Sequence, residues 1–204
     1  MARIVLLVSI ALGVTAIIAT YSRAGFLTLA VTVTLYLWKL RNRSERIWVW
    51  AALVAALACT PFLPSSYFDR LSTITDITAD RTGSSQERMY YTLAAVDHIF
   101  EHPIVGAGLG MNVVALNEER DARWRAVHNV YLEYAVDLGL PGLMMFLLLV
   151  VRCFRNTAFV QRRCEPVPAL RELFALAEGL QVSLIAFAIA ASFHPVAYHF
   201  YFYY

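Results

Sequence analysis

The sequence has few charged residues and no extended basic stretch of the kind that binds nucleic acid. Charged residues make up 16% of its 204 residues, whereas a typical soluble domain carries about a quarter. The formal net charge is only +2, so the chain generates no strong positive field. Hydrophobic residues reach 59%, more than a soluble core absorbs. The composition therefore argues against a nucleic-acid partner and indicates contact with membrane lipids.

Cysteine is scarce, and neither a disulfide framework nor a paired zinc motif fits the three positions, Cys59, Cys153 and Cys164. The sequence has no internal repeat, and its only biased segment is the aromatic stretch 198–204, which is typical of a membrane interface. The residues after the first apolar run, from Tyr21 to Arg23, make a poor signal-peptide cleavage site. We therefore expect free thiols and a retained first helix.

Several apolar stretches have the length of a membrane-spanning helix, for which roughly 17 to 25 residues suffice. The first two are separated only by the segment 21–25, which predicts a tight helical hairpin with Arg23 near its tip. The sequence thus predicts an all-α polytopic membrane protein of about five transmembrane helices. These predicted spans are 4–20, 25–38, 47–63, 128–151 and 173–198.

Basic residues set the expected orientation, because Lys and Arg in short loops stay on the cytoplasmic side. The long polar loop has nine acidic residues and six arginines between Asp69 and Arg125, a net charge of −3, and is expected on the opposite side. The predicted organisation is three transmembrane helices in 1–64, the outer loop in 65–127, and two transmembrane helices with a basic cytoplasmic loop in 128–204. The expected inner residues are Lys39, Arg41, Arg43, Arg46, Arg152, Arg155, Arg162, Arg163 and Arg171.

The outer loop is expected to contain an amphipathic helix over 84–100, which Pro103 stops. Its apolar residues recur at helical spacing: Met89, Leu93, Val96 and Phe100. The glycines that follow, Gly106, Gly108 and Gly110, predict a flexible turn that acts as a hinge. They lack the GxGxxG spacing and a preceding strand, so a dinucleotide site is not expected.

Arg23, Arg88 and the pair His128 and Asn129 are expected on the outer side, near the membrane. Charge near a bilayer is costly and is kept where it pairs or works, and the arginine fork matches pyrophosphate oxygens. His128 can act as a base toward a sugar hydroxyl, with Asn129 orienting it or the sugar. Each residue also has a plainer interpretation: Arg23 reaching lipid headgroups, Arg88 pairing with a neighbouring carboxylate, or His128 capping a helix.

Glu133 and Asp137 lie four residues apart on the fourth predicted span, on the same side as Asn129. Intramembrane carboxylates are candidates for function, or for pairing with an arginine. His98 and His102 have the i, i+4 spacing of a zinc pair, but no third ligand is evident and no metal is expected. Polar residues do not run through several spans, which disfavours a transporter or channel.

Several motifs follow one another in a characteristic order: Thr20 to Gly25, Gln86 to Tyr90, His102 to Gly110, His128 to Glu133, and Leu138 to Leu143. In this order and context the sequence resembles the O-antigen ligase and polymerase superfamily of bacterial envelope glycosyltransferases. The resemblance covers about 20–151. It implies a multi-pass protein of the bacterial inner membrane whose active site faces the periplasm.

The resemblance also implies an activity in lipopolysaccharide or polysaccharide biosynthesis, without a cofactor or required metal. Such enzymes move a glycan from undecaprenyl pyrophosphate to a hydroxyl of lipid A core, a polysaccharide or a protein. By matching motifs, Arg23 and Arg88 would hold the pyrophosphate and His128 would assist the acceptor. Asn129 and Glu133 complete the expected substrate-binding residues.

Two departures from the family pattern accompany the resemblance. Ala24 stands where glycine is often found, and members have more spans than the five expected here. We therefore expect a partial chain. The alternative prediction is a non-catalytic membrane scaffold, or an inactive fragment of such an enzyme.

Overall fold

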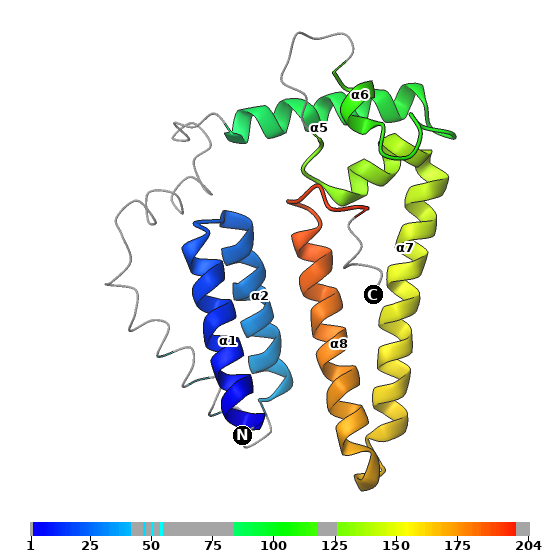
Figure 1. Cartoon of the computed structure of the whole chain (residues 1–204). Helices are drawn as coiled ribbons and strands as arrows, with labels where there is room; N and C mark the ends of the chain where they lie inside the picture. Colours follow the sequence, from blue (N-terminus) through cyan, green and yellow to red (C-terminus); the bar gives the residue numbers. More distant parts are fainter. Residues whose placement is uncertain are drawn as a thin grey trace. The chain divides into compact units, whose positions relative to one another are not determined.

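The computed structural model describes residues 2–41, 47, 50, 54, 84–117 and 126–198, whose helices are drawn in Figure 1. These residues form helices, turns and connecting segments with no strand among them, which confirms the all-helical prediction for this part of the chain. Two helical stretches, Val130–Cys164 and Pro168–Ala190, are long and apolar enough to cross a membrane, judged by length and composition. The third predicted span, 47–63, falls almost wholly outside the described residues, and a total of about five spans stays a prediction.

The chain forms two compact units, Met1–Arg81 and Thr82–Tyr204, and each is described here by itself. The first contains a helical hairpin of α1 (Ala2–Ala19) and α2 (Arg23–Lys39), as predicted. Ser22 caps α2, because its hydroxyl accepts a hydrogen bond from Gly25 N at 3.2 Å. A Cβ at Gly25 would lie 3.2 Å from Ile17 Cγ2, so glycine permits this close approach of the two helices.

In the second unit α7 (Val130–Cys164) and α8 (Arg171–Ala190) run side by side, joined through the short helix η3 (Pro168–Leu170), as Figure 1 shows. Across this pair Gln161 Nε2 donates a hydrogen bond to the Ala177 carbonyl oxygen at 3.2 Å. α7 bends at Gly139, whose φ of 68° and ψ of −175° are not helical. The bend separates a short segment, 130–138, from a long one, 140–164.

The predicted bounds of the last two spans are wrong. The fourth was expected to end at 151, but α7 continues to Cys164 because no glycine or proline interrupts it before Pro166. The fifth was expected to reach 198, but α8 ends at Ala190, and Pro195 further disfavours helix in the residues before it. Four arginines assigned to a loop therefore lie on α7: Arg152, Arg155, Arg162 and Arg163.

The predicted amphipathic helix is confirmed as α5 (Ser84–Glu101), and a single turn, α6 (Asn112–Ala115), follows it. α5 packs against α7. The buried side chains that join them form one apolar cluster of Ala95, Leu116, Val127 and Val136. Burial of this cluster anchors the otherwise polar helix to the rest of its unit.

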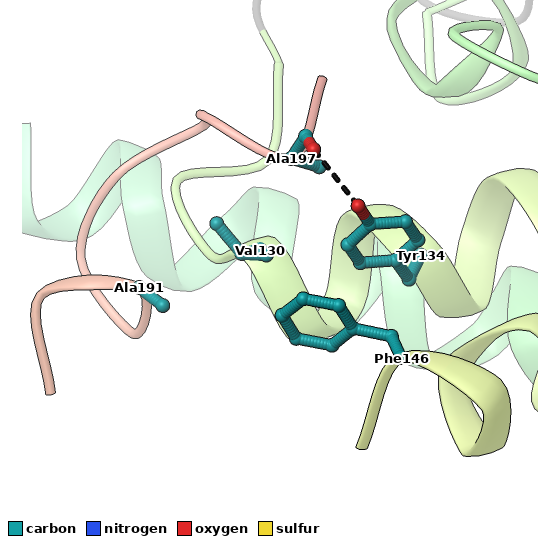
Figure 2. Close-up of a cluster of buried hydrophobic side chains, with 5 residues drawn as sticks. All are labelled: Val130, Tyr134, Phe146, Ala191 and Ala197. Carbon is teal, nitrogen blue, oxygen red and sulfur yellow. Dashed lines mark hydrogen bonds between the residues drawn. The ribbon is translucent and has the colours of Figure 1, made fainter. Parts of the chain in front are cut away.

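A second apolar cluster, shown in Figure 2, ties the start of α7 to the segment that follows α8. Tyr134 stacks on Phe146 with ring centroids 4.4 Å apart, and its hydroxyl donates a hydrogen bond to the Ala197 carbonyl oxygen at 2.8 Å. Val130 N donates to the Ala191 carbonyl oxygen at 2.8 Å. The segment 191–198 is thus folded onto the first turns of α7.

Candidate functional site

The glycine-rich segment after α5 is docked on the bend of α7. Three backbone hydrogen bonds of 2.8 Å hold it there, from Ala107 N to Val136 O, from Gly108 N to Asp137 O, and from Leu140 N to Pro103 O. The prediction of a flexible hinge at 106–110 is therefore wrong. The glycine-rich segment 106–110 and the bend at Gly139 are about 30 residues apart in sequence. Together they form one structural element.

Asp137 joins this element to two further segments. Its side chain is fully buried, with 0% exposure, and its Oδ2 atom accepts three hydrogen bonds. The donors are Gly110 N at 3.0 Å, Asn112 Nδ2 at 3.1 Å and the Tyr198 hydroxyl at 2.8 Å. One carboxylate oxygen therefore connects α7 to the glycine-rich segment, to α6 and to the residues after α8.

Glu133 has a comparable role one turn earlier. Its side chain is buried, and Oε2 accepts a hydrogen bond from Ala197 N at 3.1 Å. The described partners of both carboxylates are thus backbone amides and neutral side chains, whereas an arginine partner was the alternative considered from sequence. A substrate-binding role for Glu133 stays a prediction.

His128 and Asn129 precede α7 directly. The Asn129 side-chain oxygen accepts hydrogen bonds from Tyr131 N at 2.9 Å and Leu132 N at 3.2 Å, so it is the N-cap of α7. The half-buried His128 ring places Nδ1 3.1 Å from the Ala126 carbonyl oxygen. A carbonyl only accepts, so Nδ1 carries the hydrogen and Nε2 carries the lone pair of the neutral ring.

Arg88 is exposed on α5 and acts electrostatically on the segment after α8. Burial, and then the positive charge of Arg88, lower the pKa of His194. The second unit therefore brings Arg88 into the neighbourhood of a histidine that sequence reasoning missed. The available signal was Pro195, whose presence argued that the last helix ends before His194.

Arg23 belongs to the first unit. It is the first residue of α2, directly after the Ser22 cap, and its side chain is half-buried. Ala24, the next residue of α2, is buried with 5% exposure. The joint action of Arg23 and Arg88 on one ligand stays a prediction.

His98 and His102 line a cavity of about 600 Å³ between α5, the glycine-rich segment and α6. Their rings lie 4.7 Å apart between centroids, and burial followed by the neighbouring His102 lowers the pKa of His98. Two carboxylates, Asp97 and Glu101, also line this cavity. Among the described residues, no three His, Cys, Asp or Glu side chains are grouped so that they could hold a metal ion.

Comparison with known families matches residues 8–147 to the family described as O-antigen ligase. The matched region is more than half of the chain and contains most of the hairpin, α5, the glycine-rich segment and the bend of α7. No curated protein and no solved structure matches the chain.

Proposed function

Since the chain belongs to the O-antigen ligase family, we propose that it transfers a glycan from undecaprenyl pyrophosphate to a hydroxyl acceptor. Family membership and two helices of membrane-spanning length and composition indicate an integral membrane protein with a role in ligase- or polymerase-type glycosyl transfer. We further propose that it resides in the bacterial inner membrane and that transfer occurs on the periplasmic face.

The observation that carries this proposal is the 3.1 Å contact between His128 Nδ1 and the Ala126 carbonyl oxygen. A general base needs a lone pair directed at the proton it removes, and the Ala126 carbonyl oxygen, by accepting from Nδ1–H, leaves that lone pair on Nε2. The Asn129 cap fixes the backbone next to the ring, because its side chain accepts from the first amides of α7. His128 thus stands on a rigid support.

In the proposed reaction the acceptor hydroxyl oxygen attacks the anomeric carbon of the donor sugar. The bond from that carbon to the pyrophosphate oxygen breaks, and undecaprenyl pyrophosphate leaves with the bonding electrons. The hydroxyl proton passes to His128 Nε2. Attack opposite the leaving group inverts the configuration at the anomeric carbon.

The arginines act on the leaving group in this proposal. Negative charge increases on the pyrophosphate as the bond breaks, and guanidinium groups stabilise it through paired hydrogen bonds. Arg88 is proposed for this role within the second unit, and its support is that its charge acts on His194, in the segment that packs on the start of α7. Arg23 is assigned the same role by its family motif.

In this proposal, polar residues near the start of α7 orient the acceptor. Asn129 and Glu133 are proposed to contact the sugars, and the acceptor is a lipid A core, a polysaccharide or a protein. The Asn129 oxygen is occupied by the helix cap, so the amide Nδ2 is the atom proposed to meet the substrate.

The test is glycan transfer by the purified chain, supplied with an undecaprenyl-pyrophosphate-linked glycan and an acceptor. Arg88→Gln should reduce the rate by about a hundredfold or more, since removing one preorganised charge-stabilising donor typically has that effect. Arg171→Gln, a change of an equally charged and exposed residue on α8, is the control and should retain the parent rate. Equal rates for the parent and Arg88→Gln would contradict the proposed role of the arginine.

A further inference from the structure

Four arginines and a phenylalanine form a continuous stripe along the distal part of α7. At 3.6 residues per turn they fall within an arc of about 100° around the helix axis. The members of this arginine stripe are Arg152, Arg155, Phe159, Arg162 and Arg163. None of the residues between Val151 and Cys164 is acidic, so the stripe carries four positive charges without a compensating carboxylate on its own helical segment.

The arginine stripe lies on the face of α7 that is turned away from α8. Its arginines are exposed, and Phe159 is 59% exposed. The opposite face packs on α8, where Cys164 is buried and Gln161 donates its hydrogen bond to Ala177. The stripe is therefore not needed to hold the pair of helices together.

Among the described residues, no hydrogen bond or ion pair engages the arginines of the stripe. Within the described part of the chain, Arg152, Arg155 and Arg162 make no hydrogen bond or ion pair. Arg163 lies over the Phe159 ring, with its guanidinium carbon 5.3 Å from the ring centroid. Unpaired guanidinium groups on an exposed helix face are available to an external anion.

The apolar part of α7 is too short to cross a bilayer alone, so the stripe starts within the hydrocarbon thickness and ends near the membrane surface. The segment 140–151 spans about 18 Å, which is shorter than the roughly 30 Å of hydrocarbon in a membrane. Its exposed side chains are apolar, as Met144, Met145 and Leu148 illustrate. The first stripe arginines must therefore extend toward the headgroups, and the stripe rises about 16 Å from Arg152 to Arg163.

We propose that the arginine stripe is a binding site for the phosphate headgroups of anionic phospholipids. The guanidinium fork matches phosphate oxygens, and clustered arginines at a membrane surface attract anionic lipids. Phe159 sits among the arginines as an aromatic anchor for the interface. The expected cytoplasmic position of these residues places the lipids in the inner leaflet. This site lies on a different part of the second unit from the residues proposed for glycan transfer and is independent of that reaction.

The probe is phosphatidylglycerol, titrated into the purified full chain in neutral detergent, with phosphatidylcholine as the uncharged comparison. The thermal unfolding midpoint reports binding, because a ligand of the folded state raises it. Phosphatidylglycerol should raise the midpoint more than phosphatidylcholine does, and about 1 M NaCl should remove the difference, since it reduces the screening length to roughly 3 Å.

The variant Arg155→Gln, Arg162→Gln, Arg163→Gln should bind phosphatidylglycerol about a hundredfold more weakly, at roughly fivefold per arginine. A matched variant removes three positive charges elsewhere, through Lys39→Gln, Arg41→Gln and Arg171→Gln. Those three residues already interact within the chain, so this variant should keep the phosphatidylglycerol response. Its thermal unfolding midpoint without added lipid also shows how the loss of three positive charges alone affects stability.

Two results would overturn the proposal. One is an equal response of the parent to phosphatidylglycerol and phosphatidylcholine, which would mean that the stripe is covered by another segment of the protein. The other is an unchanged phosphatidylglycerol affinity in the stripe variant, which would place the anionic lipid elsewhere.

Discussion

Gly106 and Gly139 meet backbone to backbone where the glycine-rich segment docks on the bend of α7. A Cβ on Gly106 would lie 2.7 Å from Gly139 N and 2.5 Å from the Val136 carbonyl oxygen. A Cβ on Gly139 would lie 2.5 Å from the Ile104 carbonyl oxygen. Both residues have a φ of 68°, a backbone angle that residues other than glycine rarely adopt. Two motifs of the family therefore depend on each other for their conformation.

Gly106→Ala should destabilise the protein by about 3 kcal/mol, because left-handed strain of about 1 kcal/mol adds to overpacking of about 2 kcal/mol. Gly110→Ala is the matched control. Gly110 also has a positive φ, of 73°, but a Cβ there would meet nothing within 4 Å. It should lose only the roughly 1 kcal/mol of strain. Unfolding by a graded denaturant in detergent measures both; an equal loss for the two variants would contradict the close approach.

Asp137→Ala should remove the shared acceptor of three donors and cost about 3 kcal/mol, since each lost hydrogen bond costs about 1 kcal/mol and the buried Asn112 donor is left without this acceptor. Tyr198→Phe removes only one of these hydrogen bonds and should cost about 1 kcal/mol. Thermal unfolding of the detergent-solubilised variants gives the comparison. If Asp137→Ala unfolded at the parent temperature, the carboxylate would not connect these segments.

His194 should titrate below the usual range of histidine, because burial and the charge of Arg88 both lower its pKa. The folded state then resists protonation of this ring. Well above the unfolded pKa of about 6.5, His194 adds no pH dependence to the stability of the protein. As the pH falls through about 6.5, protonation of His194 in the unfolded state lowers that stability. NMR titration of labelled histidines measures the pKa directly.

Arg88→Gln should raise the pKa of His194 without restoring it fully, since burial is the larger cause of the shift. Glu87→Gln, on the same turn of α5, is a useful comparison because Glu87 is not a cause of the His194 shift. An unchanged His194 pKa in Arg88→Gln would show that the arginine does not act on this segment.

The helices near the amino terminus and in the loop could be predicted closely from sequence. The hairpin followed from two apolar runs separated by five residues, and α5 followed from apolar spacing that Pro103 ends. These signals are local, because helix periodicity and proline act within a few residues of themselves.

The arrangement around Asp137 could not be predicted in the same way. Its partners Gly110 and Tyr198 are 27 and 61 residues away along the chain, and no local pattern reports such pairings. The apolar pattern predicts a continuous span through Gly139, although the positive φ of this residue bends α7. His194 was missed for a related reason, since the last span was extended past the end of α8.

The most direct test of the account is glycan transfer by His128→Ala, measured beside the parent chain and His102→Ala with an undecaprenyl-pyrophosphate-linked glycan as donor. His102 is a second, exposed histidine of the same unit that has no role in the proposed reaction. The account predicts transfer by the parent, the same rate for His102→Ala, and a loss of about a hundredfold or more for His128→Ala, the usual contribution of a general base. Equal rates for the parent and His128→Ala, or no transfer by the parent chain, would contradict it.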